Sequence, residues 1–414
     1  MKADIDALMQ KYHLDGLWVQ GDLFNNAPMT YFTGIHHATF CNFIKVKNKP
    51  PVLFYQTMER EEAGKSGLPT RDSQDFPTSQ YLEKTGGDRA AAYGLKLADM
   101  LRDSGLERGR VGVYGQVEAS IFYAPLDALH QALPNLTLVG SLQGQEDPIS
   151  MARMTKDEAE AEEIRRVGKL TAEVVAKTAD FLASRHAKNG HLVFPDGKPI
   201  RVKDIKQRIS FWLAEAGLDN PEGTIFAIGR DGAIPHSSGN PEDVLELGKP
   251  IVFDIFPRGA GGSYFYDMTR SWCLGHAPDE VAMLHQQVFE VHQAVIKALK
   301  PRALFSDSQK LTCKLFREMG HATIEEDLSI QSGYVHSVGH GVGLDIHEKP
   351  FSGMTATSTD TLEPGVVITV EPGLYYPERG MGMRIEDTLY LKSDEKFEIL
   401  ADFPYDLVIP IKEA

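Results

Sequence analysis

The stretch HSVGHGVGLDIHE, residues 336–348, carries the most informative pattern in this chain. Its three histidines, His336, His340 and His347, are separated by four and seven residues. The glycines at 339, 341 and 343 disfavour a helix and allow close backbone approach, so this is not the helical His-Glu-x-x-His pattern of zinc peptidases. A lone histidine is more often structural than a ligand. Three in one glycine-rich loop favour a metal or catalytic site.

Four carboxylates in the same half of the chain lie inside or at the end of apolar, strand-like runs. They are Asp254 in IVFDIF (251–256), Asp267 in SYFYDMTR (263–270), Glu371 at the end of VVITVE (366–371) and Glu386 in MRIED (383–387). A buried carboxylate is costly unless it is paired or binds a metal. Four carboxylates and an imidazole suit Mn, Co, Fe or Zn pairs. Two divalent ions would balance the four charges and bridge a hydroxide, so the residues alone predict metal-assisted hydrolysis.

The composition is that of a soluble globular protein. The 414 residues are 42% hydrophobic and include 43 Lys plus Arg against 58 Asp plus Glu, a net charge of −15 at pH 7. This acidity argues against nucleic acid or an anionic membrane as partner. No stretch reaches about 18 apolar residues, so we expect no transmembrane helix, and the N-terminal stretch lacks the pattern of a secretory signal. Three widely spaced cysteines predict no disulfide framework and favour the cytoplasm.

Two parts of the chain differ in their pattern. Short apolar strands at 16–20, 43–46, 51–55, 110–114 and 136–139, with a helix over 90–101, predict a small α/β domain. A boundary is expected near 145–154, followed by a long helix whose capping box is Thr155 and Glu158. Beyond it, helices near 200–217, 278–300 and 305–320 and strands near 224–228, 249–256, 265–274, 365–371 and 382–392 predict an α+β domain with antiparallel hairpins.

These motifs resemble those of the pita-bread metallopeptidases, which include methionine aminopeptidases, Xaa-Pro aminopeptidases and prolidases. The segments VITVEPGLYY (367–376) and MGMRIEDTLYL (381–391) are similar to the family's glutamate motifs, and HSVGHGVGLDIHE to its histidine motif. Content and order agree over about residues 151–392. The resemblance implies a creatinase-like N-terminal α/β domain over residues 1–150 and a pita-bread catalytic domain over residues 151–414, usually in a homodimer. The size of the first part and its segment MTYFTG (29–34) favour the Xaa-Pro aminopeptidase, prolidase and creatinase branch.

The resemblance also implies a ligand set and roles for other residues. Two divalent metal ions, Mn first and Co, Fe or Zn otherwise, would be bound by Asp254, Asp267, His340, Glu371 and Glu386. Glu371 would be the general base and His347 would stabilise the oxyanion. His336 and His236 would contact the substrate or pass a proton to the leaving nitrogen. Arg384 lies two residues from Glu386, on the same face of a strand. It would hold a ligand carboxylate or the substrate, or form a structural ion pair.

Two features depart from the usual family pattern. Asp254 and Asp267 are thirteen residues apart, about two more than is usual, and Gly259, Gly261 and Gly262 predict a hairpin that absorbs the extra length. His236 is followed by Ser-Ser-Gly, where many relatives have an aromatic residue or a proline. The second departure bears on substrate choice more than on the chemistry.

The expected function is that of a metallopeptidase hydrolysing the Xaa-Pro bond of dipeptides or peptide N-termini through a metal-bridging hydroxide. Such a bond needs a shaped pocket because proline fixes φ and its nitrogen carries no hydrogen. Candidate walls of this pocket are Tyr264, Phe265, Tyr375 and Tyr376, although ordinary core or hairpin packing is the more expected role for each of them. Dipeptidase and aminopeptidase both remain open.

Other activities of the same fold are alternatives. Hydrolysis of a non-peptide small amide remains open. A metal-free creatinase or an inactive binding protein would have lost ligands, and all five are retained here. A related lyase carries an aspartate where this chain has Phe256.

Overall fold

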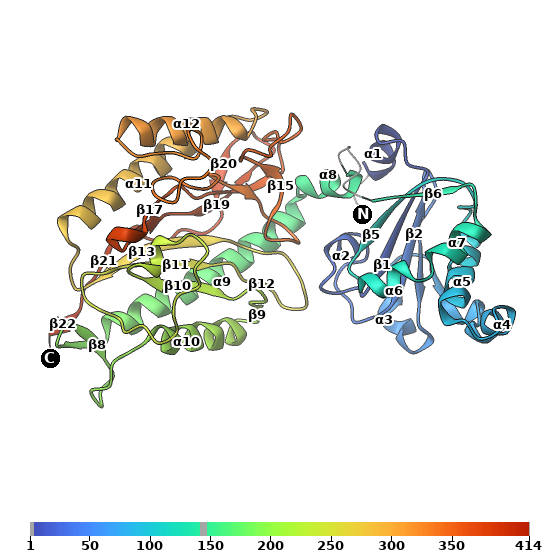
Figure 1. The fold of residues 1–414 in the computed structure, drawn as a ribbon, viewed down its shortest axis with the longest axis horizontal. Helices are drawn as coiled ribbons and strands as arrows, with labels where there is room; N and C mark the ends of the chain where they lie inside the picture. Colours follow the sequence, from blue (N-terminus) through green and yellow to red (C-terminus); the bar gives the residue numbers. More distant parts are fainter. Residues whose placement is uncertain (1–3, 141–146, 414) are drawn as a thin grey trace. The chain divides into compact units, whose positions relative to one another are not determined.

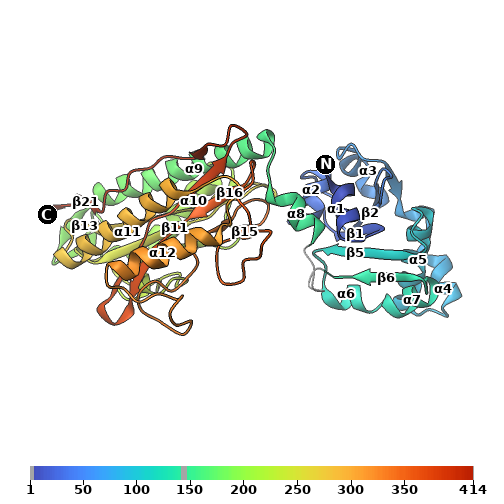
Figure 2. The same ribbon diagram turned by 90° about the horizontal axis from the view of Figure 1, so that it is seen from above.

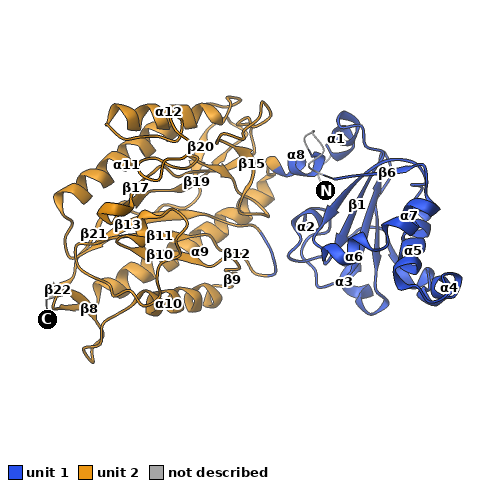
Figure 3. Cartoon of the chain, in the orientation of Figure 1, with its two compact units in different colours: residues 1–153, 261–263 blue, residues 154–260, 264–414 orange. Residues whose placement is uncertain are grey.

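The computed structural model describes residues 4–140 and 147–413 (Figure 1; Figure 2). These residues form two compact units, unit 1 with residues 1–153 and 261–263, and unit 2 with residues 154–260 and 264–414 (Figure 3). Gln145 and Glu146, in the expected boundary stretch, lie outside the described residues, as do residues 1–3. Among the residues described, none of the helices combines the length and apolar character that a membrane span requires.

Unit 1 is built on a mixed six-stranded sheet in the order β4-β3-β2-β1-β5-β6. Its strands are β1 (Gly16–Gly21), β2 (Cys41–Val46), β3 (Val52–Tyr55), β4 (Thr70–Asp72), β5 (Gly109–Gly115) and β6 (Leu136–Val139). Strand β1 lies at the centre, antiparallel to β2 and parallel to β5. These strands appear where the apolar runs predict them, because their alternate side chains build the core of this unit.

Helices connect and cover the strands of unit 1. They are α1 (Ile5–Lys11), α2 (Ala27–Thr33), α3 (Arg60–Gly64), α4 (Thr78–Lys84), α5 (Arg89–Asp103), α6 (Ala119–Tyr123), α7 (Leu126–Ala132) and α8 (Pro148–Met154). The predicted helix over 90–101 is α5. The Asp88 side chain caps it by accepting a hydrogen bond from the Ala91 backbone nitrogen at 3.0 Å. Leu97 and Leu101 on its inner face pack in one core with Trp18 of β1.

Two sheets of unit 2 carry the carboxylate and histidine motifs. The first has the order β10-β11-β13-β21 and the second β15-β14-β16-β19-β20. The strands of the first are β10 (Thr224–Ile228), β11 (Pro250–Ile255), β13 (Met268–Leu274) and β21 (Val408–Ile409), and those of the second are β14 (His340–Gly341), β15 (Glu348–Phe351), β16 (Val367–Val370), β19 (Asp387–Leu391) and β20 (Phe397–Ile399). Thr269 of β13 forms an antiparallel bridge with Glu386, which joins the two sheets.

Among the described residues, the remaining elements of unit 2 are four α-helices, the 3-10 helices η3 (Asp231–Ala233) and η4 (Pro377–Arg379), and several short strands. The helices are α9 (Glu158–Ala183), α10 (Val202–Glu215), α11 (Asp279–Ala298) and α12 (Ser306–Glu318), and the strands are β7 (His186–Lys188), β8 (His191–Val193), β9 (Leu218–Asp219), β12 (Arg258–Gly259), β17 (Gly373–Tyr376), β18 (Met381–Arg384) and β22 (Lys412–Glu413). In Figure 1 the two main sheets lie between the pair α9 and α10 and the pair α11 and α12. The predicted α+β class is confirmed.

The start of α9 differs from the prediction. The capping box is formed by Asp157 and Glu160, not by Thr155 and Glu158. The Glu160 backbone nitrogen donates to Asp157 Oδ1 at 3.0 Å, and the Asp157 nitrogen donates to Glu160 Oε2 at 2.7 Å. Thr155 is unavailable as a cap because its backbone forms a bridge with Val366. A charged cap two residues later also complements the helix dipole.

The extra residues between the two aspartates form the predicted hairpin. Arg258 and Phe265 form an antiparallel bridge, and the Gly259 nitrogen donates to the Tyr264 carbonyl at 3.1 Å. Gly261 and Gly262 have φ values of 82° and 91°, a backbone region that a residue with a Cβ rarely adopts. The hairpin therefore absorbs the added length between the ends of β11 and β13.

Candidate metal centre

The two aspartates come from neighbouring antiparallel strands of the first sheet. Asp254 lies on β11, opposite Thr269 of β13, and Asp267 directly precedes β13. Strand alternation explains their direction, since Phe253 and Ile255 face the core and Asp254 faces the other way. Both carboxyl groups are buried, and the Oδ1 atom of each has no hydrogen-bond partner among the described residues.

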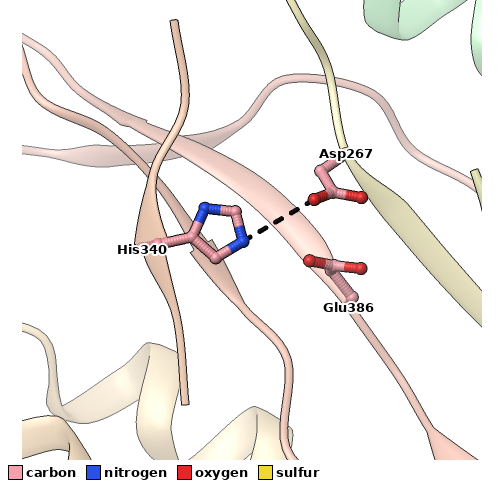
Figure 4. Close-up of side chains that lie close together, drawn as sticks. All are labelled: Asp267, His340 and Glu386. Carbon is pink, nitrogen blue, oxygen red and sulfur yellow. Dashed lines mark ion pairs between the residues drawn. The ribbon is translucent and has the colours of Figure 1, made fainter. Parts of the chain in front are cut away.

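The other three predicted ligands come from the second sheet and its connections. His340 begins β14, Glu371 directly follows β16, and Glu386 occupies the break between β18 and β19. The predicted single strand over 382–392 is therefore two strands. Figure 4 shows the side chains of Asp267, His340 and Glu386 pointing toward one another. One ligand atom from each of these three residues lies within 4.8 Å of the others.

His340 is oriented as a metal ligand would be. Its Nδ1 lies 3.1 Å from the Gly341 carbonyl oxygen, so the hydrogen is assigned to Nδ1. This leaves the lone pair of Nε2, which lies 3.7 Å from Asp267 Oδ2 and 3.5 Å from Glu371 Oε1. Burial lowers the pKa of His340 to about 3, so the ring is neutral at physiological pH.

The carboxylates crowd one another at buried positions. Burial, followed by the charges of Glu386, Asp254 and Glu371, raises the pKa of Asp267 well above its usual range. Burial and the charges of Glu371 and Asp254 also raise the pKa of Glu386, and burial raises the pKa of Glu371 to about 8. Such a cluster needs protons or cations. Two unpartnered buried carboxylate oxygens and a free imidazole nitrogen fit a divalent cation.

Arg384 contributes the positive charge of the cluster. Its Nη2 donates to Asp254 Oδ2 at 2.5 Å and its Nε to Thr269 Oγ1 at 3.1 Å. The Thr269 hydroxyl donates in turn to Glu386 Oε2 at 2.7 Å. Arg384 is therefore ion-paired with one predicted ligand and connected through a hydroxyl to another.

A second chain of hydrogen bonds runs from Arg384 to His336. Arg384 Nη1 donates to the Tyr375 hydroxyl oxygen at 2.8 Å, and that hydroxyl lies 2.9 Å from His336 Nε2. His336 Nδ1 lies 2.7 Å from the Ser337 carbonyl and is assigned the ring hydrogen. The Tyr375 hydroxyl thus donates to Nε2, and His336 is held in one orientation. Burial lowers the pKa of His336 to about 3.

All of the predicted site residues line one cavity of about 760 Å³ in unit 2. They are Asp254, Asp267, His340, Glu371, Glu386, Arg384, His236, His336 and His347. His236 and His347 are exposed. The rings of His340 and His347 lie edge to face, with centroids 4.3 Å apart.

The four candidate aromatic walls have the alternative role expected for them, ordinary core or hairpin packing. None of Tyr264, Phe265, Tyr375 and Tyr376 lines the cavity. Phe265 packs in the main core, and Tyr375 is buried behind the cavity, where its hydroxyl connects Arg384 to His336. The apolar lining comes instead from Ile225, Phe256, Ile346 and Phe351.

Thr269 and the hydroxyl of Tyr375 are the polar groups that the sequence analysis missed. Thr269 follows Asp267 by two residues and so faces the same side, which is a signal that the sequence did contain. Tyr375 belongs to a strongly apolar segment, and nothing in that segment indicates that its hydroxyl meets two functional side chains.

Known proteins share both the sequence pattern and the fold. A model of metallopeptidase family M24 matches residues 162–393. The uncharacterized peptidase YqhT of Bacillus subtilis is 29% identical over 206 residues, which cover 50% of this chain and 54% of that protein. The Xaa-Pro dipeptidase of Pyrococcus furiosus is 26% identical over 281 residues, 65% of this chain and 75% of that protein.

A solved structure extends the likeness to nearly the whole chain. The X-Pro aminopeptidase of Thermotoga maritima superposes with a TM-score of 0.72 at 22% identity, covering 96% of this chain and 99% of that one. This likeness confirms the pita-bread fold expected from the motifs. Because the family model covers more than half of the chain, including every ligand candidate, the protein belongs to metallopeptidase family M24.

Proposed function

We propose that this metallopeptidase hydrolyses the Xaa-Pro bond of dipeptides or of peptide N-termini with two divalent metal ions. The observation that carries the proposal is the meeting of two sheets at one cavity. There they bring together Asp254, Asp267, His340, Glu371 and Glu386, with two carboxylate oxygens left unpartnered. The names of the Pyrococcus furiosus and Thermotoga maritima relatives support the Xaa-Pro specificity.

The five ligand candidates divide between the two sheets. Bound ions, Mn first and Co, Fe or Zn otherwise, would supply hydroxide near neutral pH and polarise the scissile carbonyl. Glu371 lies beside His340 at the cavity surface and accepts the proton of the attacking water. It then carries that proton toward the leaving nitrogen. The ring of His340 is held neutral with its hydrogen on Nδ1, so the lone pair of Nε2 stays available to bind a cation.

The other histidines act on the substrate. His347 is exposed to the cavity and donates to the carbonyl oxygen as negative charge develops there, which is the type of contact that most lowers a barrier. His236 is exposed in the loop after Asp231–Ala233 and contacts the substrate. Both ring nitrogens of His336 are engaged, by Ser337 and by Tyr375, and burial keeps the ring neutral, so of the two expected roles we propose that His336 contacts and positions the substrate.

Xaa-Pro specificity is consistent with the shape of the cavity. Its volume of about 760 Å³ exceeds that of a dipeptide, and Phe256, Ile346 and Phe351 give it apolar walls. A proline ring presents a rigid apolar face and no backbone N–H, so apolar contact replaces the backbone hydrogen bond that other peptide bonds offer.

Release of proline from a panel of peptides tests the proposal. The panel contains Xaa-Pro dipeptides, longer Xaa-Pro-Yaa peptides and matched peptides without proline, and each is incubated with chelated protein and with protein reloaded with Mn or Co. Metal-dependent cleavage of proline dipeptides alone identifies a dipeptidase, and cleavage of the longer peptides identifies an aminopeptidase. Protein that holds two metals per chain and cleaves none of the proline peptides contradicts the Xaa-Pro specificity.

We further infer a homodimer in the cytoplasm. The dimer follows from the family resemblance, and sedimentation velocity of the metal-loaded protein tests it. The compartment is supported by Cys41, Cys273 and Cys313, which are buried free thiols as expected in a reducing environment. Cell fractionation of a tagged full-length chain tests the location.

A further inference from the structure

One wall of the cavity carries polar groups that the proposed chemistry does not use. This wall consists of the cavity-lining residues of α10 and of the turn between β9 and β10, with Lys206, Ser210, Asn220 and Glu222 as its polar members. Lys206 and Asn220 are half-buried, whereas Ser210 and Glu222 are exposed.

The ammonium group of Lys206 has no anionic partner in the described parts of the chain. Its Nζ donates one hydrogen bond, to the Ser238 carbonyl at 2.9 Å, which leaves two N–H groups of the three. Burial lowers the pKa of Lys206. Two other buried lysines of unit 2 are paired with a carboxylate. Lys156 lies 2.5 Å from Glu348, and Lys349 lies 2.9 Å from Asp360. A desolvated ammonium at a cavity therefore favours an anion from outside the chain.

Asn220 supplies an unused polar atom on the same wall. Its Nδ2 lies 3.0 Å from Thr224 Oγ1, and its Oδ1 is buried without a hydrogen-bond partner among the described residues. The amide is equally well placed after a flip, because Thr224 then donates to Oδ1. In that orientation the NH2 group takes the unpartnered position, which is buried, and a small turn of the side chain toward the cavity would let it donate to an anionic oxygen.

We propose that Lys206, assisted by Asn220, binds the free α-carboxylate of the substrate, so that the enzyme prefers dipeptides to amidated or longer peptides. This inference rests on the proposed function and narrows the proposed substrates to dipeptides with a free α-carboxylate. Because two bound divalent ions would balance the four carboxylates of the metal centre, the substrate carboxylate needs a cation of its own, and Lys206 on another wall supplies one.

Glu222 does not cancel the charge of Lys206. Burial lowers the pKa of His347, and the negative charge of Glu222 partly opposes this shift. The Glu222 carboxylate therefore interacts with His347. For Lys206, burial is the cause of the lowered pKa, with no offset from a carboxylate. Among the described residues, Lys206 therefore keeps a positive charge with no carboxylate beside it, and this charge can bind an anion.

Paired acid and amide substrates test the inference. Wild-type protein, Lys206→Met, Lys206→Arg and Lys203→Met are loaded with Mn and assayed on Ala-Pro and on Ala-Pro amide. Lys203 is a matched control because it lies on the same helix, is exposed and pairs with Glu242 at 2.6 Å. The readout is the ratio of kcat/KM for the acid to that for the amide. Binding of both compounds is measured by calorimetry.

We expect Lys206→Met to lower the acid-to-amide ratio roughly ten-fold or more, mainly through KM for the acid, because a charged hydrogen bond is lost. Lys206→Arg should restore part of the ratio, and Lys203→Met should leave it unchanged. An equal loss on acid and amide would mean that Lys206 only supports the His236 loop through Ser238, and would overturn the inference. An unchanged ratio would overturn it as well.

The two proposals fail in distinguishable ways. In one outcome the wild-type protein cleaves neither compound but binds the acid more tightly than the amide, and Lys206→Met loses that preference. This outcome would support the carboxylate site and contradict only the Xaa-Pro activity. Absence of both cleavage and binding preference would contradict both.

Discussion

Arg384 Nη2 lies 2.5 Å from Asp254 Oδ2, and both side chains are buried, with 3% and 11% of their surface exposed. The same guanidinium also donates to Thr269 Oγ1, to the Tyr375 hydroxyl and to the Pro235 carbonyl, so it makes four hydrogen bonds at once. The planar shape of the group and its permanent charge explain why arginine, rather than lysine, occupies this position. Arg384 thus neutralises part of the acidic cluster and fixes the geometry of the residues around it.

Arg384→Met should destabilise the chelated protein by about 3–5 kcal/mol, because it leaves the Asp254 carboxylate buried and unpaired. Urea unfolding at pH 8, monitored by far-UV circular dichroism, measures the loss. Arg379→Met is the control, since Arg379 pairs with Glu280 at an exposed position and its removal should change stability by less than about 1 kcal/mol. Equal effects of the two substitutions would show that Arg384 is not a structural cation.

Glu371→Gln should lower kcat by roughly 10²–10⁴-fold, as expected for loss of a general base, while the protein stays folded. The substitution keeps the size of the side chain and removes its ability to accept a proton. Turnover of the best peptide of the panel and metal content by mass spectrometry are measured on one preparation. Glu378→Gln, at an exposed position, is the control. Near-full activity of Glu371→Gln with metal bound would refute the assigned role.

His347→Ala should reduce kcat by about 10²–10³-fold and leave the metal content close to that of the wild type, because its contact is made mainly in the transition state. His340→Ala, whose ring lies beside that of His347, should lose metal and activity together. His186→Ala serves as the control, because it changes an exposed histidine that is distant in sequence from His340 and His347. If His347→Ala lost metal in proportion to activity, His347 would be a ligand.

The buried His292 should make the protein sensitive to mild acid. Burial lowers its pKa from 6.5 to about 4, with Nε2 3.3 Å from Asp387 Oδ2. Below pH 6.5 the unfolded chain binds a proton at this residue and the folded chain does not. Stability therefore falls as the pH decreases from 6.5 toward 4, by up to about 3 kcal/mol from this group.

His292→Gln, which keeps a polar side chain next to Asp387, should flatten that part of the pH dependence. Unfolding free energies from urea titrations at pH 4.5 to 7.5, compared between wild type and variant, give the difference. His276→Gln changes an exposed histidine and should leave the curve as it is. A parallel pair of curves for wild type and His292→Gln would exclude His292 as the source.

Much of the fold could be predicted because apolar periodicity and burial agree. Strands such as β10 and β16 are continuous apolar runs, and α11 and α12 begin and end within a few residues of their predicted bounds. The capping box could not be placed correctly, because the choice between Thr155 and Asp157 depends on the bridge from Thr155 to Val366, a contact between residues far apart in the chain. The break between β18 and β19 depends in the same way on the bridge from Glu386 to Thr269.

The site could be predicted only where the type of residue and its position in the sequence indicate a function. Carboxylates in apolar strands and clustered histidines are costly without a function, so Asp254, Asp267 and His340 stand out in the sequence. Lys206 and Asn220 do not, because a lysine on an amphipathic helix and an asparagine in a turn have ordinary structural reasons to be there. Their importance depends on the partners they lack among the described residues: Lys206 has no carboxylate beside it, and Asn220 Oδ1 accepts no hydrogen bond.

The division of the ligands between two sheets links the lifetime of this protein to the metal supply. Ions held between the first and second sheets would act as cross-links, and at a hundred times their dissociation constant they would add about 2.7 kcal/mol of stability. Chain that lacks them would open more often at this junction and be degraded sooner. A cell starved of the metal would then contain fewer copies of the enzyme, in addition to less active ones.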